Sequence, residues 1–586
     1  IRASDWSSDV CSSDLNNKIM KSGLAAMMAA SLVGCSSSSG DNSNNVLTVG
    51  ITAQMNGVFS PLYYESAYDA YAINLIYQSM LQYDENEELQ PVLAKELPTI
   101  SDDGKTVTFK LNKGVKFSDG SKLTSSDVKY TFTVLADPSY TGRFSSDVEN
   151  IEGYKEYHDG DATELSGIET PDDYTVVFHM TQPRIDAVTT FGTRAICSDT
   201  QYKYKKGHIS KIEKDTSNPI GSGAYKLNKY SKATGASFVR NENFKAKKGE
   251  YSIDKVIIKV CSTSTELNEL QKGNVDYLPE NADPTKIGQV SLDDNLTFNT
   301  YPRATEGYVY FNCAQGPTAD PAVRKALAYA TDRQGFVDSF FSWEKASKEA
   351  KKEKLAFVPA VYANPVSANL GTYIRGEEAL DGLETYEFNE DKANQILDEA
   401  GWEMADDGYR YKDGQKLRVR FMIAEGSSSL ETLIPMIEKT YKDIGVDLKQ
   451  TILEFNSLLS KTSDDSALGE WEMSCLAMSF TGVANTDLNS MLKTGDVNNY
   501  ARLSDSELDS LLDEAMYTTD EAKSTELYKQ VMIKENDLLP YLALYGNQNF
   551  NLYNKRVKNM KTGPIHNWSQ AMDTAQIGRA SCRERV

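Results

Sequence analysis

Residues 93–132 read LAKELPTISDDGKTVTFKLNKGVKFSDGSKLTSSDVKYTF, and they give the strongest indication of the fold. Within it, apolar and polar residues alternate over 107–117 around the turn residues Asn112-Lys113-Gly114. Alternation with a period of two around a Gly-containing turn predicts a β-hairpin. The following Thr124-Ser125-Ser126-Asp127 has the spacing of a capping box and predicts a helix that ends near Leu135.

The rest of the chain from Val46 alternates strand and helix signals without a repeat of fixed period. This order is typical of an α/β architecture and excludes a solenoid or a propeller. The expected elements are strands over 47–51 and 417–423, helices over 71–81, 321–330, 393–400 and 430–443, and a helix capped by Ser504 and Glu507. The charged run 345–354 is expected to be the solvated face of a helix.

Length and charge bound the possible functions. With 586 residues the chain exceeds what one hydrophobic core organises, which predicts several domains or lobes. Its 62 Lys and Arg residues against 84 Asp and Glu residues give a net charge of −22, which repels phosphate backbones and excludes nucleic acid as a partner. The sequence has no C-x-x-C pair, so we expect no metal and no cofactor. The four histidines are also far apart: His158, His179, His208 and His566.

The two ends of the chain are expected to be foreign to the protein. Codons for Cys11-Ser12-Ser13-Asp14 can be the reverse complement of codons for Ile577-Gly578-Arg579-Ala580, as for one DNA adapter read in opposite directions. Residues 1–15 and 577–586 are therefore interpreted as adapter-derived segments. The alternative is a genuine polar tail at each end.

Residues 16–34 have the pattern of a secretory signal peptide. An apolar stretch after Lys18 and Lys21 ends in Leu32-Val33-Gly34-Cys35, which is similar to the lipobox of bacterial lipoproteins. This pattern predicts lipidation of Cys35, a flexible tether over 35–45, and a location at the extracytoplasmic face of the bacterial cell membrane. The alternative is a core helix that ends at a buried cysteine. Four further cysteines are expected to be isolated buried thiols: Cys197, Cys261, Cys313 and Cys475.

Together with later blocks, the stretch 93–132 resembles the signature of the family 5 extracellular solute-binding proteins of ABC importers, which include oligopeptide, dipeptide and nickel binders. The match is nearly complete over Gly114-Val115-Lys116-Phe117-Ser118-Asp119-Gly120. The later blocks are PIGSGAYKL (219–227), LQKGNVDYL (270–278), VYFNCAQGPTADPAVRKALAYATDR (309–333), KANQILDEAGW (392–402) and DIGVDLKQ (443–450). Each block alone is weak, and their family order over nearly all of 46–568 carries the resemblance.

The resemblance implies an α/β class II periplasmic-binding-protein fold with three lobes, two of them hinged and one small and specific to the family. By matching, lobe I comprises 46–82, 215–300 and 545–576, lobe II comprises 83–214, and lobe III comprises 301–544. The hinges are expected near 300–302 and 544–546. Closure follows ligand binding if the ligand contacts both hinged lobes only in the closed state.

In function, the resemblance implies a monomeric binding lipoprotein and not an enzyme. It would capture an oligopeptide or dipeptide and deliver it unmodified to the permease subunits of an ABC transporter. Peptide binders of the family hold the ligand as an extended chain by main-chain hydrogen bonds, which favours many peptide sequences. An oligosaccharide, a nickel complex or another solute stays open as the ligand.

The candidate ligand contacts come from an aromatic stretch in lobe I, from the end of the lobe II helix, from lobe III and from the return crossing. They are Asn56, Phe59, Tyr63, Tyr64, Tyr68, Asp69, Tyr140, Phe480, Thr481, Asn485, Asp487 and Tyr545. Each tyrosine has the alternative of a core residue with a satisfied hydroxyl. Peptide-binding relatives carry a lobe III pattern like W-x-a-D-Y-p-d-P, whose Asp pairs with the peptide α-amine. Here residues 477–487 contain no acid before Asp487, which becomes the alternative anchor.

An enzyme of the penicillin-recognising serine acyltransferase class is the alternative from another class. Ser126-x-x-Lys129, Ser367-x-Asn369 and Lys493-Thr-Gly495 occur in the order of its motifs. Such short patterns arise by chance in a long chain, and Ser126 already belongs to the predicted capping box. This alternative is therefore remote.

Overall fold

The computed structural model describes residues 45–578 except for 65, 202–203, 215–216, 282–283, 341–382, 426, 454, 480–483 and 497. The predicted signal peptide with Cys35, the N-terminal adapter segment and the charged run 345–354 lie outside the described residues.

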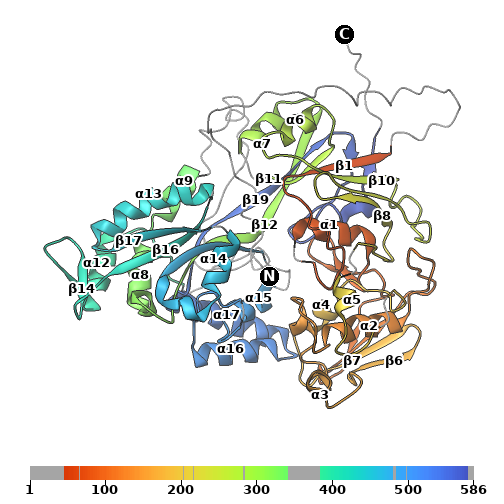
Figure 1. Ribbon diagram of the computed structural model, residues 1–586, viewed down its shortest axis with the longest axis horizontal. Helices are drawn as coiled ribbons and strands as arrows, with labels where there is room; N and C mark the ends of the chain where they lie inside the picture. Colours follow the sequence, from red (N-terminus) through yellow and green to blue (C-terminus); the bar gives the residue numbers. More distant parts are fainter. Residues whose placement is uncertain are drawn as a thin grey trace, which may run out of the picture.

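A ten-stranded mixed sheet extends across the molecule in the order β17-β16-β18-β12-β19-β11-β1-β10-β9-β8 (Figure 1). Its strands are β1 (Val46–Ile51), β8 (Tyr225–Ser231), β9 (Gly235–Arg240), β10 (Lys255–Val260), β11 (Tyr277–Asn281), β12 (Leu296–Phe311), β16 (Arg418–Ala424), β17 (Asp447–Leu453), β18 (Met473–Ser479) and β19 (Tyr541–Asn554). The opening strand β1 is parallel to both β10 and β11. It is largely buried, as expected for a parallel strand with its neighbours on both sides.

Two long antiparallel strands, β12 and β19, join the halves of this sheet. In Figure 1 they run between the group that contains β16 and β17 and the group that contains β1 and β10. Their register shifts after Pro302 and again after Gly307. The predicted crossings at 300–302 and 544–546 lie within these strands, beside the shifts. An irregular ladder bends and twists more readily than a regular one. That these residues act as hinges stays a prediction.

A second sheet has the order β4-β5-β7-β6, with β4 (Thr99–Ile100), β5 (Thr106–Lys110), β6 (Ile168–Asp172) and β7 (Thr175–His179). Here the predicted hairpin around Asn112-Lys113-Gly114 is wrong. The strand β5 pairs with β4 before it and with the distant β7, and not with the residues that follow it. The alternation before Asn112 correctly predicts a strand, β5, but alternation does not specify which strand pairs with it.

The small sheets are β2 (Leu81–Tyr83) with β3 (Leu89–Pro91), β13 (Glu403–Met404) with β14 (Arg410–Lys412) and β15 (Gln415–Lys416), and β20 (Val557–Lys558) with β21 (Gln576–Ile577). The helices are α1 (Ala67–Ile76), α2 (Ser125–Leu135), α3 (Tyr154–Asp159), α4 (Ala187–Gly192), α5 (Ser210–Lys214), α6 (Glu266–Gln271), α7 (Pro284–Ser291), α8 (Pro321–Tyr329), α9 (Arg333–Phe340), α12 (Glu390–Glu399), α13 (Ser428–Asp443), α14 (Phe455–Thr462), α15 (Ala484–Leu492), α16 (Ser506–Met516) and α17 (Glu521–Leu538).

Helix starts follow their capping residues. The predicted capping box of α2 is confirmed, with Thr124 as the N-cap and Asp127 bound to the Thr124 backbone N–H. The predicted start of α8 at Asp320-Pro321 is also confirmed. Two predictions are corrected. The N-cap of α16 is Asp505 and not Ser504, because the Asp505 carboxylate accepts from the backbone of the first turn. The helix predicted over 71–81 is α1, which ends at Ile76, so that Leu81 belongs to β2.

In the described part of the chain, the buried apolar side chains form four clusters. One cluster takes all its fully buried members from residues 62–212 and contains closely packed phenylalanine rings. The rings of Phe178 and Phe191 stack with 4.3 Å between their centroids, and Phe132 meets Phe178 edge-on at 5.0 Å. This cluster falls largely within the predicted lobe II. The lobe boundaries themselves stay predictions.

The PIGSGAYKL block contains a glycine that no larger residue can replace without a clash. A Cβ on Gly221 would lie 2.1 Å from the carbonyl oxygen of Ile76, at the end of α1. We expect Gly221→Ala to lower the free energy of unfolding by about 3 kcal/mol, because the obstacle is backbone and cannot rotate away. Thermal unfolding checks this. Gly469→Ala is the matched control, since there the nearest atom is a side-chain oxygen at 3.6 Å. Equal melting temperatures for the two variants would contradict the steric argument.

Candidate functional site

The segment that precedes α1 is fixed by a buried carboxylate. Asp69 in the first turn of α1 is fully buried, and its Oδ1 accepts from the backbone N–H of Gly57 at 3.0 Å. Burial raises the pKa of Asp69 to about 6, while hydrogen bonds from the backbone of Asn56, Gly57 and Val58 lower it. Asp69 therefore holds the loop that contains the exposed Asn56.

The candidate Phe59 lies inside the same loop region. It is 1% exposed and packs edge-on against Tyr230, with 5.1 Å between ring centroids. Tyr68 contacts the ring of Tyr71 edge-on at 6.1 Å, and its hydroxyl lies 3.5 Å from Thr52 Oγ1. These contacts place Phe59 in the core and leave Tyr68 half-buried.

Three further candidates meet in a cluster that joins the segment before α1 to the segment after α2. The rings of Tyr63 and Tyr140 lie 5.3 Å apart, and the Tyr140 hydroxyl donates to the carbonyl of Leu62 at 2.6 Å. The rings of Tyr64 and Phe144 lie 5.6 Å apart. Burial raises the pKa of the Tyr63 and Tyr140 hydroxyls, which keeps both protonated as donors.

Two arginines complete this group, which we call the arginine–aromatic cluster: Tyr63, Tyr64, Tyr140, Arg143, Phe144 and Arg194. The Arg143 guanidinium lies over the rings of both Tyr64 and Phe144. Arg194 lies over Phe144 as well, and it is ion-paired with Asp147. Sequence reasoning missed both arginines. The signal available was the Arg143-Phe144 pair, which follows Tyr140 within the same short loop.

The candidate anchor Asp487 lies in the first turn of α15 and is 7% exposed. Burial is the main cause of the raised pKa of the Tyr83 hydroxyl, and nearby carboxylates that include Asp487 add to it. The Tyr528 pKa is raised for the same two reasons. Asp487 therefore lies near a phenol of the predicted lobe II and a phenol of α17. Sequence reasoning missed both tyrosines, since they stand far from α15 in the chain.

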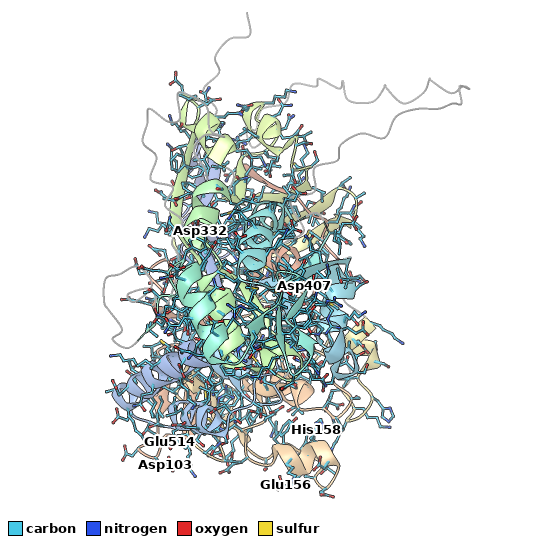
Figure 2. All side chains as sticks on the ribbon, turned by 90° about the vertical axis from the view of Figure 1, so that its left-hand side faces the viewer. Asp103, Glu156, His158, Asp332, Asp407 and Glu514 are labelled. Atoms are coloured by element: carbon cyan, nitrogen blue, oxygen red, sulfur yellow. The ribbon has the colours of Figure 1, made fainter. Side chains whose placement is uncertain are left out.

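The predicted lobes II and III touch close to these residues. The backbone N–H of Ile185 donates to the carbonyl of Met516 at 2.9 Å, at the end of α16. Figure 2 labels two exposed acids near this boundary, Asp103 beside the second sheet and Glu514 on α16. Next to the bond, Arg184 pairs with Asp186 at 2.7 Å. The boundary therefore combines one direct backbone bond with charged side chains.

The other candidates are placed as follows. Tyr545 in β19 is buried against Phe336 and Phe340, with ring centroids at 5.9 and 6.3 Å. It is not part of the arginine–aromatic cluster. Phe480 and Thr481 lie outside the described residues, and of Asn485 only the backbone is described, in α15.

The serine acyltransferase motifs have other contacts. The Ser126 hydroxyl donates to Asp199 Oδ2 at 2.8 Å, and Lys493 pairs with Asp513 on α16. Ser367 lies outside the described residues. Neither contact joins one of these motifs to another.

The buried carboxyl of Asp127, which lies beside Asp199, makes the stability of the fold depend on pH. Burial, followed by the charge of Asp199, raises the pKa of Asp127 to about 6. The folded protein therefore holds a proton that the unfolded chain, with an ordinary pKa of about 4, releases. The contribution of this proton to the free energy of unfolding is fully present below pH 4, and it is lost as the pH rises from about 4 to about 6.

We expect Asp199→Asn to raise the free energy of unfolding by about 1 kcal/mol at pH 8, where Asp127 is ionised, because a neighbouring like charge disappears. At pH 4 the substitution is expected to change little. Thermal unfolding at both pH values checks this, with Glu164→Gln, an exposed acid of the same region, as control. An equal gain at both pH values would exclude a role of charge.

Three features of the described residues concern metal ligands, thiols and long apolar helices. These residues contain no group of three or more His, Cys, Asp or Glu side chains placed to hold a metal ion. Cys197, Cys261, Cys313 and Cys475 are unpaired there, and all but the half-buried Cys313 are buried. No helix in this part of the chain combines the length and apolarity that a membrane span needs.

Comparison with known proteins identifies the family. Residues 88–500 match the family described as bacterial extracellular solute-binding proteins, family 5. The chain belongs to this family. Family 5 proteins bind solutes for ABC importers on the outer side of the membrane and are not enzymes. The predicted periplasmic-binding-protein fold is thereby confirmed.

This family 5 protein is similar to relatives over nearly its whole length. It is 25% identical to the oligopeptide-binding protein AppA of Bacillus subtilis over 548 residues, which cover 90% of this chain and 93% of the relative. It is 24% identical to the dipeptide-binding protein of Escherichia coli over 565 residues, 92% and 94% of the two chains. Its fold resembles lactococcal OppA, solved with an endogenous peptide in the closed conformation, with a TM-score of 0.76 and 18% identity over 91% of this chain and all of that one.

Proposed function

We propose that this family 5 protein captures peptides between its hinged lobes and hands them unmodified to the permease of an ABC transporter. The observation that carries the proposal is the full-length similarity to an oligopeptide-binding and a dipeptide-binding relative. The match to the oligopeptide-binding relative covers 90% of this chain and 93% of that protein.

The described residues supply groups that suit a peptide. Tyr63, Tyr64 and Tyr140 offer aromatic surface, which binds side chains of many shapes. Asp487 offers a buried carboxylate close to the boundary of lobes II and III. We propose that it receives the peptide α-amine, as the displaced counterpart of the acid that peptide-binding relatives carry in this lobe. A charge-assisted hydrogen bond of this kind contributes about 1.5 to 3 kcal/mol.

The setting of the protein is part of the proposal. Cys35 carries the lipid, residues 35–45 form the tether, and the binding lobes stand outside the cell membrane as a monomer. The strands β12 and β19 provide the hinge between lobes I and III. Closing on the peptide then shifts the population toward the form that the permease receives.

Native mass spectrometry of protein purified from a peptide-rich extract tests this function. We expect co-purified masses that fragment as peptides, and a higher melting temperature when the same peptides are added back. The peptides should leave the protein with unchanged mass after incubation. Recovery of a sugar or a nickel complex alone would overturn the peptide assignment, and the appearance of cleaved peptides would overturn the binding role.

A further inference from the structure

Arg143 differs from the other arginines of this protein in its partners. Its side chain is exposed, and its guanidinium carbon lies 4.6 Å from the ring centroid of Tyr64 and 4.6 Å from that of Phe144. Of the arginine side chains that the structure describes, Arg143 alone neither pairs with a carboxylate nor donates to a backbone carbonyl. The others do one or the other: Arg184, Arg194, Arg240, Arg324, Arg333, Arg410, Arg418, Arg420, Arg502 and Arg556.

Arg143 has no carboxylate partner within the cluster. Arg194 lies on Phe144 as well, 3.7 Å from its ring centroid, so that one phenyl ring contacts two guanidinium groups. The carboxylate of Asp147 is engaged by Arg194. Glu213, an acid beside the cluster, accepts from Thr141 Oγ1 at 3.3 Å and does not pair with Arg143. Arg143 therefore has no carboxylate partner among the described residues, in a chain whose net charge is −22. An acidic protein that keeps an exposed cation without an acidic partner offers that cation to an anion from outside.

The two rings also orient the Arg143 guanidinium in a way that suits a carboxylate. Aromatic contact with the face of a guanidinium leaves the N–H groups at its edge free to donate. Two parallel N–H groups fit the two oxygens of a carboxylate, and side-chain order set by the rings reduces the entropy lost on binding. Tyr64, one of these rings, is itself a candidate ligand contact.

We propose that Arg143 binds a carboxylate of the captured peptide and thereby favours peptides that carry an acidic group near this point. The inference rests on the proposed function and deepens it by naming a ligand class. The carboxylate can be the C-terminus or the side chain of a Glu or Asp residue. Tyr64 and Phe144 position the guanidinium, and Arg194, which pairs with Asp147, also contacts the ring of Phe144.

Calorimetry with four variants of one peptide tests the inference. The peptide carries Glu or Gln at a central position and ends in a free carboxylate or an amide. For the wild-type protein we expect either the change from Glu to Gln or the change from C-terminal carboxylate to amide to weaken binding by about 5- to 20-fold. This is the range of a partly exposed charge-assisted hydrogen bond. In Arg143→Gln this preference should disappear, and in Arg143→Lys it should be retained in part. Added salt should weaken the wild-type preference.

Arg240→Gln is the matched control, because Arg240 also lies over two rings, those of Tyr225 and Tyr251, in another part of the molecule. The Arg240→Gln variant should prefer the carboxylate-bearing peptide by the same factor as the wild type. A preference for the free C-terminus or for Glu identifies the source of the carboxylate, and either result supports the inference. An unchanged preference in Arg143→Gln, or none in the wild type, would overturn the inference and leave peptide binding intact. Absence of binding for all four peptides would overturn the proposed function as well.

Discussion

Replacement of Arg324 by Met is expected to lower the free energy of unfolding by about 3 to 5 kcal/mol, the cost of breaking a buried charged network. Arg324 lies in α8 and is 2% exposed. Its Nη1 donates to the carbonyls of Thr318 and Ala319 at 2.7 and 3.0 Å. Its Nε donates to the last residues of α17, with 2.9 Å to the Leu538 carbonyl. Methionine fills the space of the aliphatic stem but leaves these carbonyls without donors.

The position of these carbonyls explains why the charge is tolerated without an acid. The end of α17 carries the negative end of the helix dipole, which stabilises a cation there. Leu539 follows in a left-handed conformation, with φ of 49°, and the chain then enters β19. Arg324 thus fixes the entry into one of the two strands that join the halves of the sheet.

Urea unfolding followed by tryptophan fluorescence measures the effect, since Trp471 is buried in the same region. Lys325→Met is the matched control. Lys325 pairs with Asp537, whose side chain is 74% exposed, so its loss should cost about 0.5 kcal/mol or less. Arg324→Lys keeps the charge and part of the bonding and should fall between the two. Similar losses for Arg324→Met and Lys325→Met would contradict the role assigned to the buried network.

Local features of the fold could be predicted from the sequence, because neighbours in the chain determine them. The capping box at Thr124 and the start of α8 at Asp320 depend on residues within one helical turn, and both are confirmed. Pairing over long distances could not be predicted. The strand β5 bonds to β7, and Gly221 is required by the carbonyl of Ile76. The sequence reveals an alternation or a glycine but not the surface that it meets.

The candidate site was predictable to a similar degree. The sequence shows an aromatic stretch and a separate Tyr140, and the structure brings Tyr63, Tyr64 and Tyr140 together. Sequence reasoning missed Arg143, because the Arg143-Phe144 pair that follows Tyr140 is a weak signal by itself. Its meaning comes from the absence of an acidic partner among the described residues, which only the structure reveals. Burial likewise distinguishes Asp487 from exposed acids of lobe III such as Asp391.

Asp487→Asn is expected to weaken binding of peptides with a free α-amine by about 10- to 100-fold, the equivalent of one charge-assisted hydrogen bond of about 1.5 to 3 kcal/mol. The amide keeps the size of the side chain and removes its charge. Since Asp487 is 7% exposed, the peptide amine would replace water around it and meet the carboxylate in a medium that screens charge poorly. Calorimetry with one peptide, free and N-acetylated, measures the effect.

The acetylated peptide separates recognition of the amine from an indirect effect through the neighbouring phenols of Tyr83 and Tyr528. It carries no charged amine, so Asp487→Asn should leave its affinity unchanged while the affinity of the free peptide falls to the same level. Asp391→Asn is the control, because Asp391 also stands in the first turn of a lobe III helix but is exposed. Equal losses of affinity for the free and the acetylated peptide would assign Asp487 a structural role. The two peptides differ only in their N-terminal amine, so a carboxylate that binds this amine must affect them differently.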